Sequence, residues 1–149
     1  KYAVDYLSKY DSSKKNLVNV LKRKIIKINL SNIEKNKLFG VLEEIILKLE
    51  KNDLINDNRY AQSKILSFSN AGKSEKYIFN YLINKGINKS ILQNILLDIK
   101  NNNDEWELDS AKIFARKKRI LESNDSYNKK LAKLARAGFS YEICKKIIG

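Results

Sequence analysis

The side chains of this chain that could take part in chemistry are mainly positively charged, and they are clustered. Lys112, Arg116 and Arg119 are spaced i, i+4 and i+7, so on a helix they share one face, opposite Ala111 and Ala115. The cluster extends from residue 112 to residue 136, and its basic residues are Lys112, Arg116, Lys117, Lys118, Arg119, Lys129, Lys130, Lys133 and Arg136. Such a cluster is typical of a surface that binds a polyanion, although it also occurs on a face that is merely solvated.

The charge of the whole chain agrees with a polyanionic partner. Lys and Arg number 30 against 17 Asp and Glu, which gives a formal net charge of +13. A second basic cluster comprises Lys14, Lys15, Lys22, Arg23, Lys24 and Lys27. Nucleic acid, an acidic protein and a membrane surface are all partners of the right sign. Tyr10, Tyr60, Tyr77, Tyr81 and Tyr127 offer stacking for bases, or else they pack in or beside the core.

Catalytic and metal-binding patterns are missing from the sequence. There is no histidine and a single cysteine, Cys144, so the commonest general base and a zinc ligand set are absent. Gly72-Lys73-Ser74 resembles the end of a P-loop but lacks its upstream glycine. We therefore expect no enzyme activity and no cofactor, and we expect Cys144 to be a buried, inert thiol.

Neither a membrane span nor an export signal is recognisable. No window approaches 18 consecutive apolar residues, and the N-terminal residues contain no apolar signal core. These features predict a cytoplasmic protein without membrane contact.

The elements that position the cations are predicted to be helices arranged as repeats. Proline is absent and glycine is scarce, which favours an all-α fold. Apolar residues and a turn glycine in residues 79–96 recur 52 residues later, in residues 131–148. Recurrence at such a period is typical of repeat proteins. We expect three tandem three-helix repeats, 1–55, 56–102 and 103–149, which form an elongated, curved array suited to a long partner.

Local signals predict where several helices begin and end. Ser12-Ser13 should cap one helix, and Ser31 with Glu34 forms a capping box. Further predicted starts are Asp57, Ser74, Asn88, Asp104 and Ser140, and predicted ends are Asn52-Asp53, Gly72, Gly86 and Gly138. The helix after Ser31 is predicted to bury Leu38, Val41, Leu42, Ile45, Ile46 and Leu49.

Three sequence motifs resemble those of the RecX family, regulators of the RecA recombinase. The motifs are Leu54-Ile55-Asn56-Asp57-Asn58-Arg59-Tyr60-Ala61, then Ile78-x-x-x-Leu82-x-x-Lys85-Gly86-Ile87, and finally Arg136-Ala137-Gly138-Phe139-Ser140-Tyr141-Glu142-Ile143. Weaker similarity at Ala3, Tyr6 and Leu7 extends the resemblance over nearly the whole chain.

The resemblance implies a non-enzymatic, monomeric protein that lies in the groove of the RecA–DNA filament and inhibits the recombinase. Its partners would be the RecA filament and single- and double-stranded DNA. Candidate contacts are Arg59, Lys73, Lys76, Lys112, Arg116, Lys117, Arg119, Lys129, Lys130 and Lys133. The alternative is a helical DNA-binding protein of nucleoid or helix-turn-helix type that acts independently of RecA.

Overall fold

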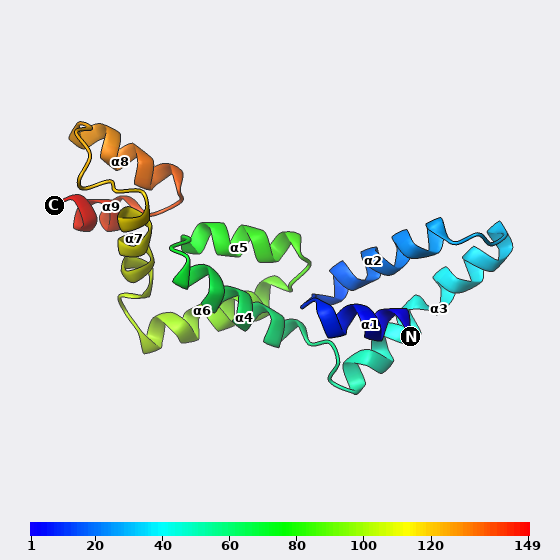
Figure 1. Cartoon of the computed structure of the whole chain (residues 1–149). Helices are drawn as coiled ribbons and strands as arrows, with labels where there is room; N and C mark the ends of the chain where they lie inside the picture. Colours follow the sequence, from blue (N-terminus) through cyan, green and yellow to red (C-terminus); the bar gives the residue numbers. More distant parts are fainter. The chain divides into compact units, whose positions relative to one another are not determined.

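The computed structural model describes residues 1–149 and contains helices and turns but no strand, which confirms the all-α prediction (Figure 1). The helices are α1 (Tyr2–Lys9), α2 (Lys14–Lys27), α3 (Asn32–Lys51), α4 (Asp57–Asn70), α5 (Glu75–Asn84), α6 (Lys89–Asn102), α7 (Trp106–Lys117), α8 (Tyr127–Arg136) and α9 (Tyr141–Ile148). None of them combines the length and the apolar character needed to cross a membrane. The chain divides into two compact units, residues 1–60 with 85–87 and residues 61–84 with 88–149.

The first unit is built around α2 and α3, which lie side by side (Figure 1). Both begin at predicted caps, because Ser13 Oγ accepts the Asn16 N–H and Ser31 Oγ accepts the Glu34 N–H, each at 3.2 Å. The buried core residues of this unit are Ala3, Leu17, Leu21, Ile25, Leu42, Ile46, Leu49 and Ile55. Val41 was predicted to be buried with them, but it is 39% exposed because it lies at the edge of the apolar stripe.

The second unit ends in a helical subdomain in which α9 packs against both α7 and α8 (Figure 1). Its core consists of Ala111, Ala115, Ile120, Leu134, Phe139 and Cys144. The two alanines allow close packing of α7 because their side chains are small. Cys144 is fully buried, and burial raises the pKa of its thiol above the usual range, which keeps it in the unreactive neutral form.

Helices α3, α4, α7 and α8 end in the same way, with one residue in the left-handed conformation. These residues are Asp53, Gly72, Arg119 and Gly138, with φ of 57°, 82°, 50° and 100°. After α7, for example, the Arg119 N–H donates to the Arg116 carbonyl at 3.2 Å and the Ile120 N–H to the Ala115 carbonyl at 3.0 Å. This pair of hydrogen bonds is the Schellman motif. The predicted ends at Asp53, Gly72 and Gly138 are therefore confirmed.

The prediction that Arg119 continues the basic face of its helix is wrong. The helix ends at Lys117, and Arg119 occupies the left-handed position that glycine usually takes. The helix ends before Arg119 because Ile120, the residue after Arg119, is buried in the same core as Ala115. Lys112 and Arg116 alone therefore share the helical face.

The predicted cap at Asp104 is also wrong. Helix α7 begins at Trp106 with Glu105 as its cap residue, and Glu105 makes no side-chain capping bond. Asn103 instead organises this turn: its Oδ1 accepts the Glu105 N–H at 3.0 Å, and its Nδ2 donates to Asp109 Oδ2 at 3.3 Å.

One arrangement of a serine cap and a distant turn occurs in each unit. In the first, Ser13 Oγ donates a 2.7 Å hydrogen bond to the Lys85 carbonyl, directly before Gly86. In the second, Ser74 Oγ donates a 2.8 Å bond to the Ala137 carbonyl, directly before Gly138. Each serine also caps its own helix. This recurrence agrees with repeats in the chain, whose number and bounds stay a prediction.

Candidate nucleic-acid interface

A basic cavity of about 350 Å³ lies where α7 packs on α9 in the second unit. Lys112 and Arg116 line it from α7, and Lys146 lines it from α9. Ala115 and Ile147 contribute its apolar wall, and Glu122 is the one acidic residue that lines it. The arrangement brings three cations to one concave site.

Packing of the two helices positions these cations. Ala111 and Ala115 are buried against the core, so Lys112 and Arg116, on another face of the same helix, are exposed. On α9, Cys144 is fully buried and Ile147 packs at the edge of the core, which leaves Lys146 exposed beside them. The side chains of Lys112, Arg116 and Lys146 form no hydrogen bond or ion pair in the structure. They are therefore available to an anionic ligand.

Several other candidate cations make local contacts around the same subdomain. Lys117 Nζ donates to the Ala71 carbonyl at 3.2 Å, and Lys130 Nζ donates to the Leu121 carbonyl at 3.1 Å. Lys133 forms an ion pair with Asp125, and this bond holds the pKa of the Asp125 carboxyl below its usual value. These three lysines thus fix turns, which reduces the freedom with which they can follow a nucleic-acid backbone.

The remaining candidates are dispersed. Arg59, in the first unit, is paired with Asp53: Nη1 lies 2.9 Å from Oδ2, and Nη2 donates to the Asp53 carbonyl at 3.1 Å. Lys73 Nζ lies 4.7 Å from the centre of the Tyr77 ring, a cation–π contact. Lys76, Arg119 and Lys129 are exposed on α5, in the turn after α7 and on α8.

The lysine cluster of the first unit is partly used in structural contacts. Lys14 Nζ lies 2.8 Å from Glu50 Oε2, and the hydrogen bond to Glu50 raises the pKa of Lys14. Lys24 Nζ lies 5.0 Å from the centre of the Tyr2 ring. Lys15, Lys22, Arg23 and Lys27 are exposed. The cations of this cluster do not line a common cavity, in contrast to Lys112, Arg116 and Lys146 between α7 and α9.

The sequence is 34% identical over 154 residues to regulatory protein RecX of Myxococcus xanthus strain DK1622, and the alignment spans 98% of this chain and 81% of that protein. This chain belongs to the RecX family. The crystal structure of RecX from Lactobacillus salivarius matches 99% of the chain with a TM-score of 0.72 at 30% identity, and 90% of that structure is covered. A second structure, of regulatory protein RecX, matches 98% of the chain with a TM-score of 0.71 at 26% identity, over 70% of its own length. No protein-family model matches the sequence.

Lys146 of this RecX-family chain is a candidate residue that the sequence reasoning missed. It lies outside the basic run of residues 112–136 and joins Lys112 and Arg116 only because α9 folds back onto α7. The helical spacing of Ile143, Cys144 and Ile147 in α9 predicts that Lys146 lies on a solvent-exposed face. It does not reveal which cations lie next to Lys146.

The tyrosines divide between packing and exposure. Tyr60 is only 4% exposed, and the rings of Tyr77 and Tyr81 pack edge-on against Phe68 at centroid distances of 5.5 and 4.8 Å. Tyr10 and Tyr127 are 57% and 45% exposed. Packing therefore accounts for Tyr60 and Tyr81, whereas Tyr77, at 41% exposed, presents part of its ring to solvent as Tyr10 and Tyr127 do.

Proposed function

We propose that this RecX-family chain is a non-enzymatic regulator that binds the RecA–DNA filament and lowers recombinase activity. Family membership supports the regulatory role, and the Myxococcus relative is named a regulatory protein. The observation that carries the DNA part of the proposal is the convergence of Lys112, Arg116 and Lys146 on one cavity. Their positive charge suits phosphate, and contacts to phosphate need no particular base sequence.

In this proposal the protein acts as a monomer and contacts both the DNA and the RecA subunits of the filament. Single- and double-stranded DNA both offer phosphates, so the cavity between α7 and α9 fits either. Three tandem repeats, 1–55, 56–102 and 103–149, would let the chain follow a filament by placing comparable surfaces along it. The recurrence of the contacts Ser13–Lys85 and Ser74–Ala137 supports this repeat organisation.

The experiment that tests this proposal is DNA-dependent ATP hydrolysis by RecA of the same organism, titrated with this protein. We expect hydrolysis to fall at ratios below about one molecule per RecA subunit. The rival function, DNA binding independent of RecA, has the same charge and helices. It predicts tight binding to naked duplex DNA without loss of ATP hydrolysis, and that outcome would replace the proposal.

A further inference from the structure

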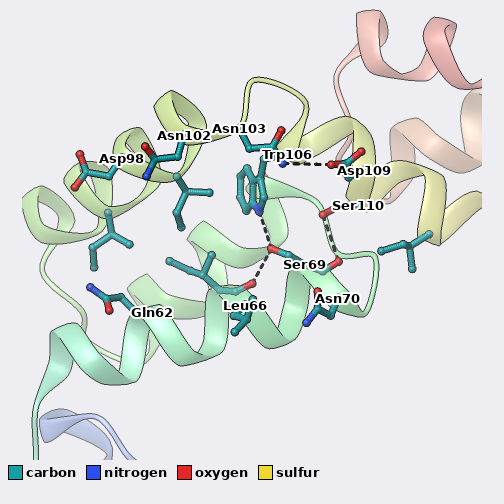
Figure 2. A pocket seen from close by; sticks show the side chains of 14 residues that line it. Gln62, Leu66, Ser69, Asn70, Asp98, Asn102, Asn103, Trp106, Asp109 and Ser110 are labelled. Carbon is teal, nitrogen blue, oxygen red and sulfur yellow. Dashed lines mark hydrogen bonds between the residues drawn. The ribbon is translucent and has the colours of Figure 1, made fainter.

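A groove with a volume of about 570 Å³ lies between α4, α6 and α7, within the second unit (Figure 2). Its apolar wall includes Ile65, Ile95 and Trp106, which are 1%, 8% and 8% exposed. Leu66, which also lines the groove, is 65% exposed. Polar side chains lie around this apolar wall, and Figure 2 shows Asp98, Asn102 and Asn103 on one side of the groove and Asn70 and Ser110 on the other. The groove therefore offers both apolar contact and hydrogen bonds.

Buried hydrogen bonds fix the shape of this groove. The indole Nε1 of Trp106 donates to Ser69 Oγ at 2.9 Å, and Ser69 Oγ donates to the Ile65 carbonyl at 2.7 Å. Ser110 Oγ donates to the Ser69 carbonyl at 3.4 Å, so α7 is tied to the end of α4 at two points (Figure 2). A groove held open by its own hydrogen bonds requires little ordering when it binds a ligand.

The charge of the groove is opposite to that of the chain. Its charged lining residues are Asp98 and Asp109, and no lysine or arginine lines it, although the chain carries a net charge of +13. Asp109 accepts a hydrogen bond from Asn103, whereas Asp98 is exposed and forms no hydrogen bond or ion pair. Phosphates are disfavoured beside these carboxylates, and a cationic side chain is favoured.

We propose that this groove binds a short surface segment of the recombinase that carries an apolar side chain next to a lysine or arginine. The apolar side chain contacts Leu66 and Trp106, and the cation pairs with Asp98. The amides of Asn70 and Asn102 are placed to pair with the segment's backbone. The inference rests on the proposed function and adds to it a protein contact separate from the DNA contact at Lys112, Arg116 and Lys146.

The test measures binding of the full-length chain to immobilised RecA without DNA, so that DNA contacts make no contribution. Asp98→Lys is compared with Glu43→Lys, which makes the same charge change at an exposed position of α3. Leu66→Ala is compared with Leu97→Ala, since Leu97 is 54% exposed but does not line the groove. We expect affinity to fall roughly tenfold for Asp98→Lys and about fivefold for Leu66→Ala, with little change in either control.

Two further readouts separate the possible failures. Thermal melting should be nearly the same within each matched pair, because all four positions are exposed. Affinity for naked DNA should be the same for Asp98→Lys and Glu43→Lys. Equal RecA affinity within both pairs, or no binding of the wild-type chain to DNA-free RecA, overturns the groove assignment.

The groove assignment and the proposed function fail in different ways. Groove-dependent binding to RecA without any effect on ATP hydrolysis would uphold the groove and contradict the inhibitory function. Light scattering tests the other occupant, a second copy of this chain. A wild-type dimer that both groove variants convert to monomers, with RecA affinity unchanged, would overturn the assignment to the recombinase.

Discussion

The hydroxyl of Ser74 donates a 2.8 Å hydrogen bond to the carbonyl of Ala137, and the same oxygen accepts the N–H of Tyr77 at 3.1 Å. Ser74 is fully buried. One side chain therefore caps α5 and holds the turn between α8 and α9, which lies far along the sequence. Ser13 combines the same two roles in the first unit, where it caps α2 and bonds to the Lys85 carbonyl.

Removal of the Ser74 hydroxyl should destabilise the protein. Ser74→Ala leaves the Tyr77 N–H and the Ala137 carbonyl without this partner, which typically costs about 1–3 kcal/mol of unfolding free energy. The measurement is urea unfolding followed by circular dichroism. Ser67→Ala, at an exposed position of α4, is the matched control and should stay within about 0.5 kcal/mol of the wild type. A Ser74 variant as stable as this control would contradict the dual role.

Two glycines should respond to the same substitution in opposite directions. Gly138 has φ of 100°, and a Cβ atom there would lie 2.5 Å from Ser74 Oγ, so Gly138→Ala introduces both backbone strain and a clash. Gly40 lies inside α3, and a Cβ atom there meets nothing within 4 Å. Gly40→Ala should therefore stabilise the protein by about 0.5–1 kcal/mol. Gly138→Ala should destabilise it by more than about 1 kcal/mol. Equal melting temperatures for the two variants would refute this expectation.

Local features of the sequence allowed correct prediction of the helical class and of most helix ends. Ser31, Asn88 and Ser140 act as caps because each bonds to N–H groups two or three residues away, and such contacts can be inferred from short spacing. Gly72 and Gly138 end helices because the left-handed conformation suits glycine. These signals depend only on neighbouring residues.

Features that depend on tertiary contacts were not predictable in this way. The Ser69–Trp106 bond and the approach of Lys146 to Lys112 and Arg116 join residues distant in sequence. Arg119 was placed on a helical face because its spacing fits one. Its true conformation follows from the burial of Ile120, which outweighs the left-handed strain.

Because of this strain, replacing Arg119 with glycine should make the folded protein more stable. A non-glycine residue in the left-handed region carries a cost of about 1 kcal/mol or more. Arg119→Gly should therefore raise the unfolding free energy relative to Arg119→Ala, which loses the same charge but keeps the strain. If Arg119 binds phosphate, both variants should weaken DNA binding equally. Denaturation curves that rank alanine above glycine would contradict the conformation.

Glu107 should make the stability depend on pH. Burial chiefly raises the pKa of its carboxyl, repulsion from Glu75 raises it further, and Lys100 opposes both. The native state therefore binds the Glu107 proton more tightly than the unfolded state does. The favourable contribution of this protonation to the free energy of unfolding is complete below the ordinary pKa of about 4.3, and it is lost as pH rises through the folded-state pKa. Glu107→Gln should be more stable than the wild type at pH 7.

The pH dependence supplies the check on this prediction. The stability difference between Glu107→Gln and the wild type should vanish below about pH 4, where both side chains are neutral. A variant less stable than the wild type at pH 7 would show that the carboxylate makes a favourable contact which outweighs its burial.

The most direct test of the central claim is a titration of RecA's DNA-dependent ATP hydrolysis with the wild-type protein and with the triple variant Lys112→Ala, Arg116→Ala and Lys146→Ala. We predict that the wild-type chain inhibits hydrolysis below about one molecule per RecA subunit. We expect the triple variant, which should fold normally because all three side chains are exposed, to require roughly tenfold more protein, since it lacks the three proposed phosphate contacts. Hydrolysis that stays unchanged up to one wild-type molecule per subunit would contradict the account.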